Sequence, residues 1–260
     1  MRKDFRRKTA GLVLVAAMAA AAMLKPGAAM AEETAVQPEA IKALTGMGAY
    51  LRTLKSFTLA ADTVQDDELD NGQKIQISGR TTYQVRTPDR LRLTVDSDTA
   101  HRVYYYDGKT VTQFAPEPNL YAVFDAPDTI AKTIDLARSR YGLSLPIADL
   151  FWAGADDAAI KKITSARLVG VSMLDGQACN HFAFRLPRVD FQLWIRKDGD
   201  PAPCELVVTD RTDPAGAQNG ALISIDATSE FPDSTFVFVP PAGASKITIE
   251  PVAGASTGSN

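Results

Sequence analysis

The sequence predicts a mainly β fold of the α+β class, in which a strongly bent or closed antiparallel sheet packs against a few helices. Apolar side chains recur at every second position through most of residues 56–238, which is the spacing of half-buried strands. Turn-forming dipeptides separate these runs, namely Asn71-Gly72, Asp107-Gly108 and Asp175-Gly176. With no clear internal repeat and no linker, we expect residues 32–250 to form a single domain.

Residues 1–31 have the pattern of a cleavable secretory signal. A basic start (residues 2–8) precedes an uncharged apolar run (residues 11–24), and Ala29-Met30-Ala31 then matches the small-x-small pattern of signal peptidase sites. The apolar run is shorter than the roughly 20 residues that span a bilayer, so we expect cleavage after Ala31. No cysteine follows the run directly, which argues against a lipid anchor. The predicted location is the periplasm.

The charge of the chain argues against two classes of partner. The formal net charge is −3, and residues 1–31 carry six Lys/Arg and one Asp, so the rest of the chain carries −8. Such a chain lacks the basic face that nucleic acid requires, and charge does not draw it to an anionic lipid surface. Because no second long apolar stretch follows, we do not expect an integral membrane protein. Residues 251–260 are expected to form a disordered tail.

The first helix is expected from Pro38, which suits a first helical position. Gly46 and Gly48 weaken this helix, and they either allow a close approach to the sheet or have no structural role. The apolar residues of its buried face recur at helical spacing: Ile41, Leu44, Met47, Leu51 and Leu54.

The strands that follow are interrupted once by helical segments. We expect a helix with Asp128 as its N-cap and Gly142 as the residue that ends it. A short apolar turn opened by Pro146 (residues 147–152) and a brief helix (residues 156–162) come next. The expected strands begin at Ser56 and include residues 74–85, 90–95, 102–106, 111–114, 120–124, 166–174, 182–186, 191–196, 204–208, 221–225 and 236–238.

Five motifs carry a resemblance to a known family. They are Leu44-x-x-Met47-x-x-Tyr50-Leu51-x-x-Leu54-x-x-Phe57, Leu145-Pro146-Ile147-Ala148-Asp149-Leu150-Phe151, Asp175-Gly176-x-x-Cys179-x-His181-x-Ala183-Phe184-Arg185, Asp190-Phe191-Gln192-Leu193-Trp194-Ile195 and Phe236-x-Phe238-x-Pro240-Pro241-x-Gly243-Ala244. The chain resembles a bacterial family of predicted periplasmic domains of unknown function. That family is similar to the lipoprotein carrier LolA and to other outer-membrane lipoprotein-sorting proteins.

The resemblance implies a half-open, LolA-like barrel of the eleven-strand type, with a helical lid over an apolar cavity for acyl chains. LolA uses an arginine to hold its lid closed, and no motif places that arginine in this sequence. The alternative to a cavity is a filled core, which is the commoner use of apolar residues. The residues expected to line the cavity are Ile75, Ile77, Tyr83, Leu91, Leu93, Val103, Tyr105, Phe182, Phe184, Leu193 and Trp194.

Two cysteines, Cys179 and Cys204, lie at the starts of the first and third strands of a meander. An oxidising compartment favours a disulfide between them, but strands in those places are not usually adjacent, so the sequence leaves the pairing open.

We expect no metal site. The acidic residues near the first hairpin, which include Asp66, Glu68 and Asp70, depart from the spacing of a calcium loop and fit a solvated loop better.

Catalytic motifs are missing from the sequence, and we expect neither a catalytic residue nor a cofactor. The leading hypothesis is a non-enzymatic periplasmic carrier or binder of an apolar ligand, either a lipid or an acylated protein, with a membrane-bound protein as a further partner. The alternative is a periplasmic sensor or scaffold that binds a protein. A third hypothesis is a hydrolase that uses Cys179 and His181, which share one strand face.

Overall fold

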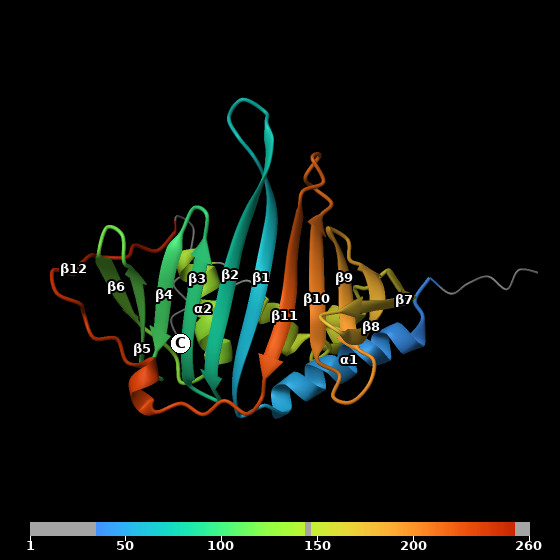
Figure 1. Ribbon diagram of the computed structural model, residues 1–260, viewed down its shortest axis with the longest axis horizontal. Helices are drawn as coiled ribbons and strands as arrows, with labels where there is room; N and C mark the ends of the chain where they lie inside the picture. Colours follow the sequence, from blue (N-terminus) through green and yellow to red (C-terminus); the bar gives the residue numbers. More distant parts are fainter. Residues whose placement is uncertain (1–34, 144–146, 253–260) are drawn as a thin grey trace, which may run out of the picture. The chain divides into compact units, whose positions relative to one another are not determined.

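Twelve strands form one continuous sheet in the computed structural model, which describes residues 35–143 and 147–252 (Figure 1). Their order across the sheet is β12-β6-β5-β4-β3-β2-β1-β11-β10-β9-β8-β7. The strands are β1 (Ser56–Glu68), β2 (Lys74–Arg86), β3 (Arg90–Ser97), β4 (His101–Tyr106), β5 (Thr110–Ala115), β6 (Leu120–Asp125), β7 (Ser165–Leu174), β8 (Gln177–Arg185), β9 (Val189–Arg196), β10 (Pro203–Asp210), β11 (Gln218–Asp226) and β12 (Ser245–Lys246).

The sheet is curled but does not close. Strands β1 to β11 pair antiparallel with their neighbours, and the two-residue β12 pairs parallel with β6. Its two edges, β12 and β7, stay apart. The prediction of a mainly β, half-open antiparallel sheet with helices packed on it is therefore confirmed.

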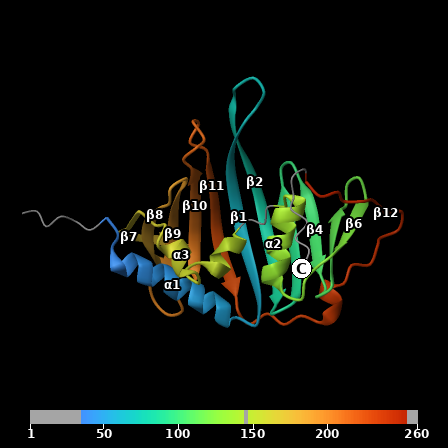
Figure 2. The ribbon, with the colours of Figure 1, turned by 180° about the vertical axis from the view of Figure 1, so that it is seen from behind.

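Helices α1 (Pro38–Thr53), α2 (Ile130–Tyr141) and α3 (Asp157–Ile160) and the short 3-10 helix η1 (Ala148–Trp152) lie on one face of the sheet (Figure 2). This helix-covered face holds the core, because alternate strand residues point to it and meet the apolar stripes of the helices. Core residues on this face include Leu44, Met47, Leu51, Leu59, Tyr83, Leu93, Phe184 and Leu193.

The hairpin turns differ in type although their sequences look alike. At Asp175-Gly176 both residues have positive φ, as a type I′ turn requires. At Asn71-Gly72 only Gly72 does, and the Leu69 amide bonds to the Gln73 carbonyl across a longer loop. At the second turn the Asp107 carboxylate accepts the amides of Lys109 and Thr110 and fixes the loop instead.

Two expected elements take another form. The N-cap of α2 is Thr129, whose hydroxyl accepts the Lys132 amide, and not Asp128. The expected strand at 236–238 is absent, because Phe236 ends a 3-10 helix, η2 (Asp233–Phe236), and Phe238 lies in irregular chain. Prolines at 232, 240 and 241 remove the backbone donors that a paired strand needs there.

Residues 227–244 instead form a strap that passes the lower ends of β1, β2 and β3 and then runs along the edge of the sheet to β12 (Figure 1). Phe238 packs on Tyr105, Phe114 and Tyr121, with ring centroids 5.1 to 5.4 Å apart. Arg86 anchors the strap through an ion pair with Asp233.

The expected signal (residues 1–31), the tail beyond 252 and Pro146 lie outside the described residues and stay predictions. Within the described part of the chain, no helix combines the length and the apolarity that a membrane span needs.

Candidate functional site

An apolar pocket of about 360 Å³ lies between the helices and the sheet. Its wall on the sheet side comes from β1, β2 and β3, and its other walls come from the end of α1, the first turns of α2 and η1. The lining residues are Leu51, Arg52, Phe57, Tyr83, Val85, Thr87, Pro88, Leu91, Thr129, Ile130, Ala131, Ile134, Ala148 and Phe151. A void of about 20 Å³ beside it shares Leu91 and Ile134, so the space between α2 and the sheet is incompletely filled.

The segment over the pocket, residues 147–154, is held from both sides and is called the lid segment below. Arg52 of α1 donates from Nη1 to the Phe151 carbonyl (3.1 Å) and the Ala153 carbonyl (3.3 Å). Arg138 of α2 pairs with Asp149 at 2.7 Å. The Phe151 ring lies 5.6 Å from the Phe57 ring at the start of β1. Ile147 and Leu150 are buried in the core as well, so the lid segment is attached both by apolar packing and by these polar contacts.

Polarity is low inside the pocket. Burial raises the pKa of the Tyr83 phenol well above its usual value, so this side chain is a neutral hydroxyl under all ordinary conditions. Arg52 is the one charged residue among the lining residues, and it is exposed. The arrangement suits a chain of methylene groups rather than a polar substrate.

The predicted cavity residues are only partly brought together. Tyr83 and Leu91 line the pocket, and Leu93 lines the small void beside it. Phe182, Phe184 and Leu193 belong to the filled core. Ile75 lines a polar hollow near the first hairpin turn, and Ile77 is half-buried along the same hairpin.

Three of the predicted residues lie on the opposite face of the sheet, so they do not line the cavity. Val103 and Tyr105 flank Tyr104, which faces the helices, and Tyr105 contacts the strap. Trp194 follows Leu193 directly, and consecutive strand residues point to opposite faces.

Most of the lining residues were not predicted from the sequence. Leu51, Ile130 and Ile134 stand on the apolar stripes of α1 and α2, and these stripes were the available signal. Nothing local in the sequence marks Val85 or Phe151 as lining residues, because the docking of the lid segment decides their place.

His181 and Trp194 pair across β8 and β9 on the face opposite the helices. Their rings stack at 3.8 Å, and His181 Nε2 lies 3.0 Å from Gln192 Oε1. The Trp194 Nε1 donates to Ser172 Oγ at 3.2 Å. Burial lowers the pKa of His181, while the hydrogen bond to Gln192 opposes that effect. His181 is therefore a structural residue whose imidazole is stacked on one neighbour and hydrogen-bonded to another.

This lowered pKa predicts a loss of stability in mild acid. A histidine with a pKa near 6.5 when unfolded binds a proton more readily than the folded one. Its contribution is therefore complete above about pH 6.5 and is lost as the pH falls through the folded value. We expect the urea midpoint to drop between pH 7.5 and 5.5, and to drop less in H181Q. In H101Q, which removes the chain's other histidine, the full drop should remain; an equal drop in H181Q would contradict the assignment.

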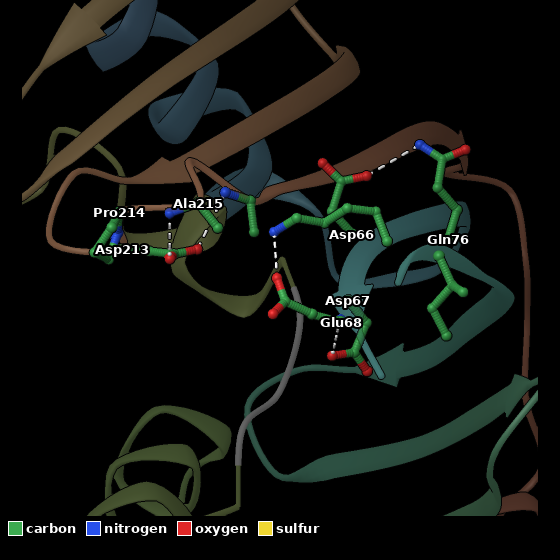
Figure 3. A pocket seen from close by; sticks show the side chains of 10 residues that line it. Asp66, Asp67, Glu68, Gln76, Asp213, Pro214 and Ala215 are labelled. Carbon is green, nitrogen blue, oxygen red and sulfur yellow. Dashed lines mark hydrogen bonds and ion pairs between the residues drawn. The ribbon is translucent and has the colours of Figure 1, made fainter. Parts of the chain in front are cut away.

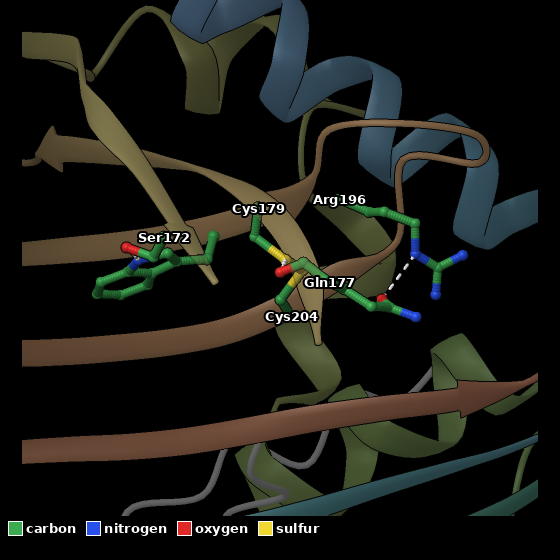
Figure 4. The surroundings of a disulfide bond; sticks show 6 residues. Ser172, Gln177, Cys179, Arg196 and Cys204 are labelled. Carbon is green, nitrogen blue, oxygen red and sulfur yellow. Dashed lines mark hydrogen bonds between the residues drawn. A yellow bond between two sulfur atoms is a disulfide. The ribbon is translucent and has the colours of Figure 1, made fainter. Parts of the chain in front are cut away.

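Cys179 and Cys204 form a disulfide with a Cα–Cα distance of 6.7 Å (Figure 4). The bond links β8 to β10 past the end of β9, which lies between them in the sheet. A β-bulge makes this possible, because Cys204 is the extra residue between Pro203 and Glu205. Since its sulfur is bonded, Cys179 has no thiolate to act as the nucleophile of a hydrolase.

A polar hollow of about 930 Å³ lies between the β1–β2 hairpin and residues 213–217 (Figure 3). Its carboxylates are already used. Asp66 accepts from Gln76 Nε2 and the Gln218 amide, which lowers its pKa, and Glu68 pairs with Lys74 at 2.6 Å. Asp213 accepts the amides of Ala215 and Ala217. Among the described residues, no group of three potential metal ligands occurs.

The edge strand β7 exposes apolar side chains. Val169 and Val171 are each 54% exposed and Met173 is 68% exposed. The chain at 35–37 covers only the start of this edge, through hydrogen bonds with Ala166 and Leu168. Val169 is an extra, bulged residue opposite β8, which is a common irregularity of edge strands.

Comparison with known proteins gives one family and several similar structures. The family model described as "predicted periplasmic protein (DUF2092)" matches residues 40–250. No curated protein matches the chain.

Similar solved structures include MucB (15% identity, TM-score 0.47, covering 78% of this chain and 64% of MucB). They also include the Mycobacterium tuberculosis lipoprotein LppX (13%, TM-score 0.46, 72% and 94%) and a LolA superfamily protein from Nitrosomonas europaea (11%, TM-score 0.39, 76% and 97%). The chain thus spans less than two thirds of MucB. With TM-scores below 0.5, function is inferred below from this chain's own residues.

Proposed function

We propose, from the premise that this chain belongs to the DUF2092 family of periplasmic proteins, that it is a non-enzymatic carrier or binder of an apolar ligand. The ligand is an acyl chain, presented by a lipid or by an acylated protein. The observation that carries the proposal is the apolar pocket of about 360 Å³ beneath the lid segment. Pockets of this size and polarity are typical of small-molecule sites, which enclose most of the ligand surface.

Three features of the pocket support an acyl chain. Its walls are side chains of Phe57, Val85, Leu91 and Ile134 with no carboxylate among them. Its cover, the lid segment, is held in part by polar contacts at the surface, namely the Arg52 hydrogen bonds and the Arg138–Asp149 ion pair, and each such contact contributes little stability. Apolar burial supplies the affinity, since each buried methylene contributes about 0.8 kcal/mol.

Filling the pocket should weaken binding. Ala131, half-buried in the first turn of α2, lines the pocket, while the next residue, Lys132, is exposed and pairs with Asp128. We expect A131W to weaken the binding of 1-dodecanol, measured by native mass spectrometry of the secreted chain, at least about tenfold, since most of the buried apolar contact is lost.

The matched control is K132W, which places the same side chain in solvent and should bind 1-dodecanol like the wild type. Urea midpoints of both variants verify the fold. No binding of 1-dodecanol by the wild-type chain, or equal binding by A131W, would rule out the pocket as an acyl site.

The exposed edge of β7 favours a second candidate function, the binding of a protein partner. An edge strand offers unpaired backbone groups to an extended segment of another chain, and apolar side chains at alternate positions give such pairing affinity. The occupant would be an extended, apolar segment that continues the pairing begun by residues 35–37.

The test uses a photo-reactive amino acid at Val171, with Val64, exposed on β1 inside the sheet, as the control position. A single adduct at 171 alone, followed by slowed amide exchange of β7 in the purified complex, would support this candidate. Adducts at both positions, or unchanged exchange, would exclude it.

A further inference from the structure

The rim of the apolar pocket carries an unbalanced positive charge. Asp89, Asp128 and Asp149 each stand next in sequence to a lining residue, and each already has its own cation. The pairs are Asp89–Arg90 at 2.8 Å, Asp128–Lys132 at 2.9 Å and Asp149–Arg138 at 2.7 Å. The guanidinium of Arg52 has no carboxylate partner among the described residues, so the net charge at this part of the pocket rim is positive.

The guanidinium is also held in place with donors to spare. Both of its hydrogen bonds leave from Nη1, to the carbonyls of Phe151 and Ala153. In the part of the chain that the structure describes, Nε and the Nη2 amino group have no acceptor. Arginine presents five N–H donors in a fixed fork that matches a carboxylate or a phosphate. An anion at this position would bind without rearrangement of the side chain.

The first turn of α2 adds positive electrostatic potential on the same side of the pocket as Arg52. Thr129, Ile130 and Ala131 line the pocket at the N-terminal end of a 12-residue helix. The helix dipole places partial positive charge there. The dipole alone would not define a site, but it has the same sign as Arg52 and faces the same space.

We infer that the pocket selects single-chain amphiphiles with an anionic head group, whose tail fills the pocket while the head oxygens bind Nε and Nη2 of Arg52. This inference rests on the proposed function, because it names the class of apolar ligand that the pocket takes. The shared chemistry is a carboxylate or phosphate on an acyl or alkyl chain. Neutral and cationic chains of the same length gain only the apolar contact.

The test compares four ligands with twelve-carbon chains: dodecanoate, dodecyl phosphate, 1-dodecanol and dodecyltrimethylammonium. Each is titrated into the secreted chain below its micelle concentration by calorimetry. We expect the anions to bind at least about tenfold more tightly than 1-dodecanol, as a charge-assisted hydrogen-bonded pair provides, and the cation to bind most weakly. The ratio of dodecanoate to dodecyl phosphate distinguishes a fatty acid from a phospholipid-like head.

R52Q should remove the preference for anions, so that dodecanoate binds no more tightly than 1-dodecanol. The ratio of the two affinities is the readout, because R52Q also removes the hydrogen bonds to the lid segment. The matched control is R80Q, which removes the same charge from an arginine that pairs with Asp62 outside the pocket; it should keep the preference. If 1-dodecanol and dodecanoate bind equally to the wild type, this inference is wrong and the proposed function stands. If none of the four binds, the proposed function fails. If R52Q still binds dodecanoate more tightly than 1-dodecanol, or binds neither, Arg52 does not select the anionic head group and the inference is overturned.

Discussion

Replacing both Cys179 and Cys204 by alanine should lower the free energy of unfolding by about 3 kcal/mol. The disulfide closes a loop with a sequence separation of 25 residues, and a cross-link of that span typically stabilises a small domain by about 2–4 kcal/mol through the unfolded state. Both half-cystines are buried, at 0% and 7% exposure, so the bond is built into the packing between β8 and β10. Urea unfolding of the wild type and C179A/C204A at one pH measures the difference.

Reduction supplies the control for this experiment. Under a strong reductant the wild type should unfold at nearly the same urea concentration as C179A/C204A, while the variant itself should be insensitive to the reductant. A variant as stable as the oxidised wild type would show that β9 alone holds β8 and β10 together. The same experiment tests the hydrolase hypothesis, because that hypothesis requires Cys179 to be a free thiol.

Gly48→Ala should destabilise the protein, and Gly46→Ala should stabilise it. A Cβ at Gly48 would lie 1.8 Å from the Ala153 carbonyl oxygen, whereas nothing lies within 4 Å of one at Gly46. Both changes bring the same gain of about 0.5–1 kcal/mol in helix propensity. At Gly48 the contact forces α1 and the lid segment apart, which costs about 1–3 kcal/mol as overpacking does. Urea unfolding of the two variants isolates the contact, because the propensity gain cancels.

The same pair of variants reports on the pocket. Arg52, one turn after Gly48, holds the lid segment through the Phe151 and Ala153 carbonyls. Pushing Ala153 away should break these bonds and speed the dissociation of 1-dodecanol in G48A but not in G46A. Equal dissociation rates in both variants would mean that the lid segment does not limit release, and equal stabilities would contradict the close packing.

Sequence alternation predicted the strands because the two faces of this sheet differ in polarity. It located Tyr83, Leu91 and Leu93 on the helix-covered face. It gave no rule for separating a pocket from a filled core, since both are lined by the same residue types. Leu193 and Trp194 could not both line one cavity, because consecutive residues of a strand point to opposite faces of the sheet, and the sequence alone shows this.

Other features depend on interactions that no local pattern records. Cys204 meets Cys179 only because a bulge in β10 adds one residue. Phe236 and Phe238 alternate as strand residues do, and the pattern therefore predicted a strand. In the structure they belong to the strap, where Phe238 packs on Tyr105 and Phe236 packs on Phe231. Two turns with the sequence of a type I′ hairpin adopt other loops, which are closed by the Leu69 amide on the Gln73 carbonyl and by the amides of Lys109 and Thr110 on the Asp107 carboxylate.

The position of β1 in the sheet sets an order on folding. β1 is the first strand of the chain, yet it lies in the middle of the sheet, between β2 and β11. Strands β1 to β6 and β7 to β11 are two meanders of short-range contacts, and the β1–β11 ladder joins them over residue pairs as distant as Thr58 and Asp226. Long-range pairings of this kind form late, because the loop that they close is large. A chain that emerges from a membrane N-terminus first therefore cannot complete this sheet until nearly all of it has crossed.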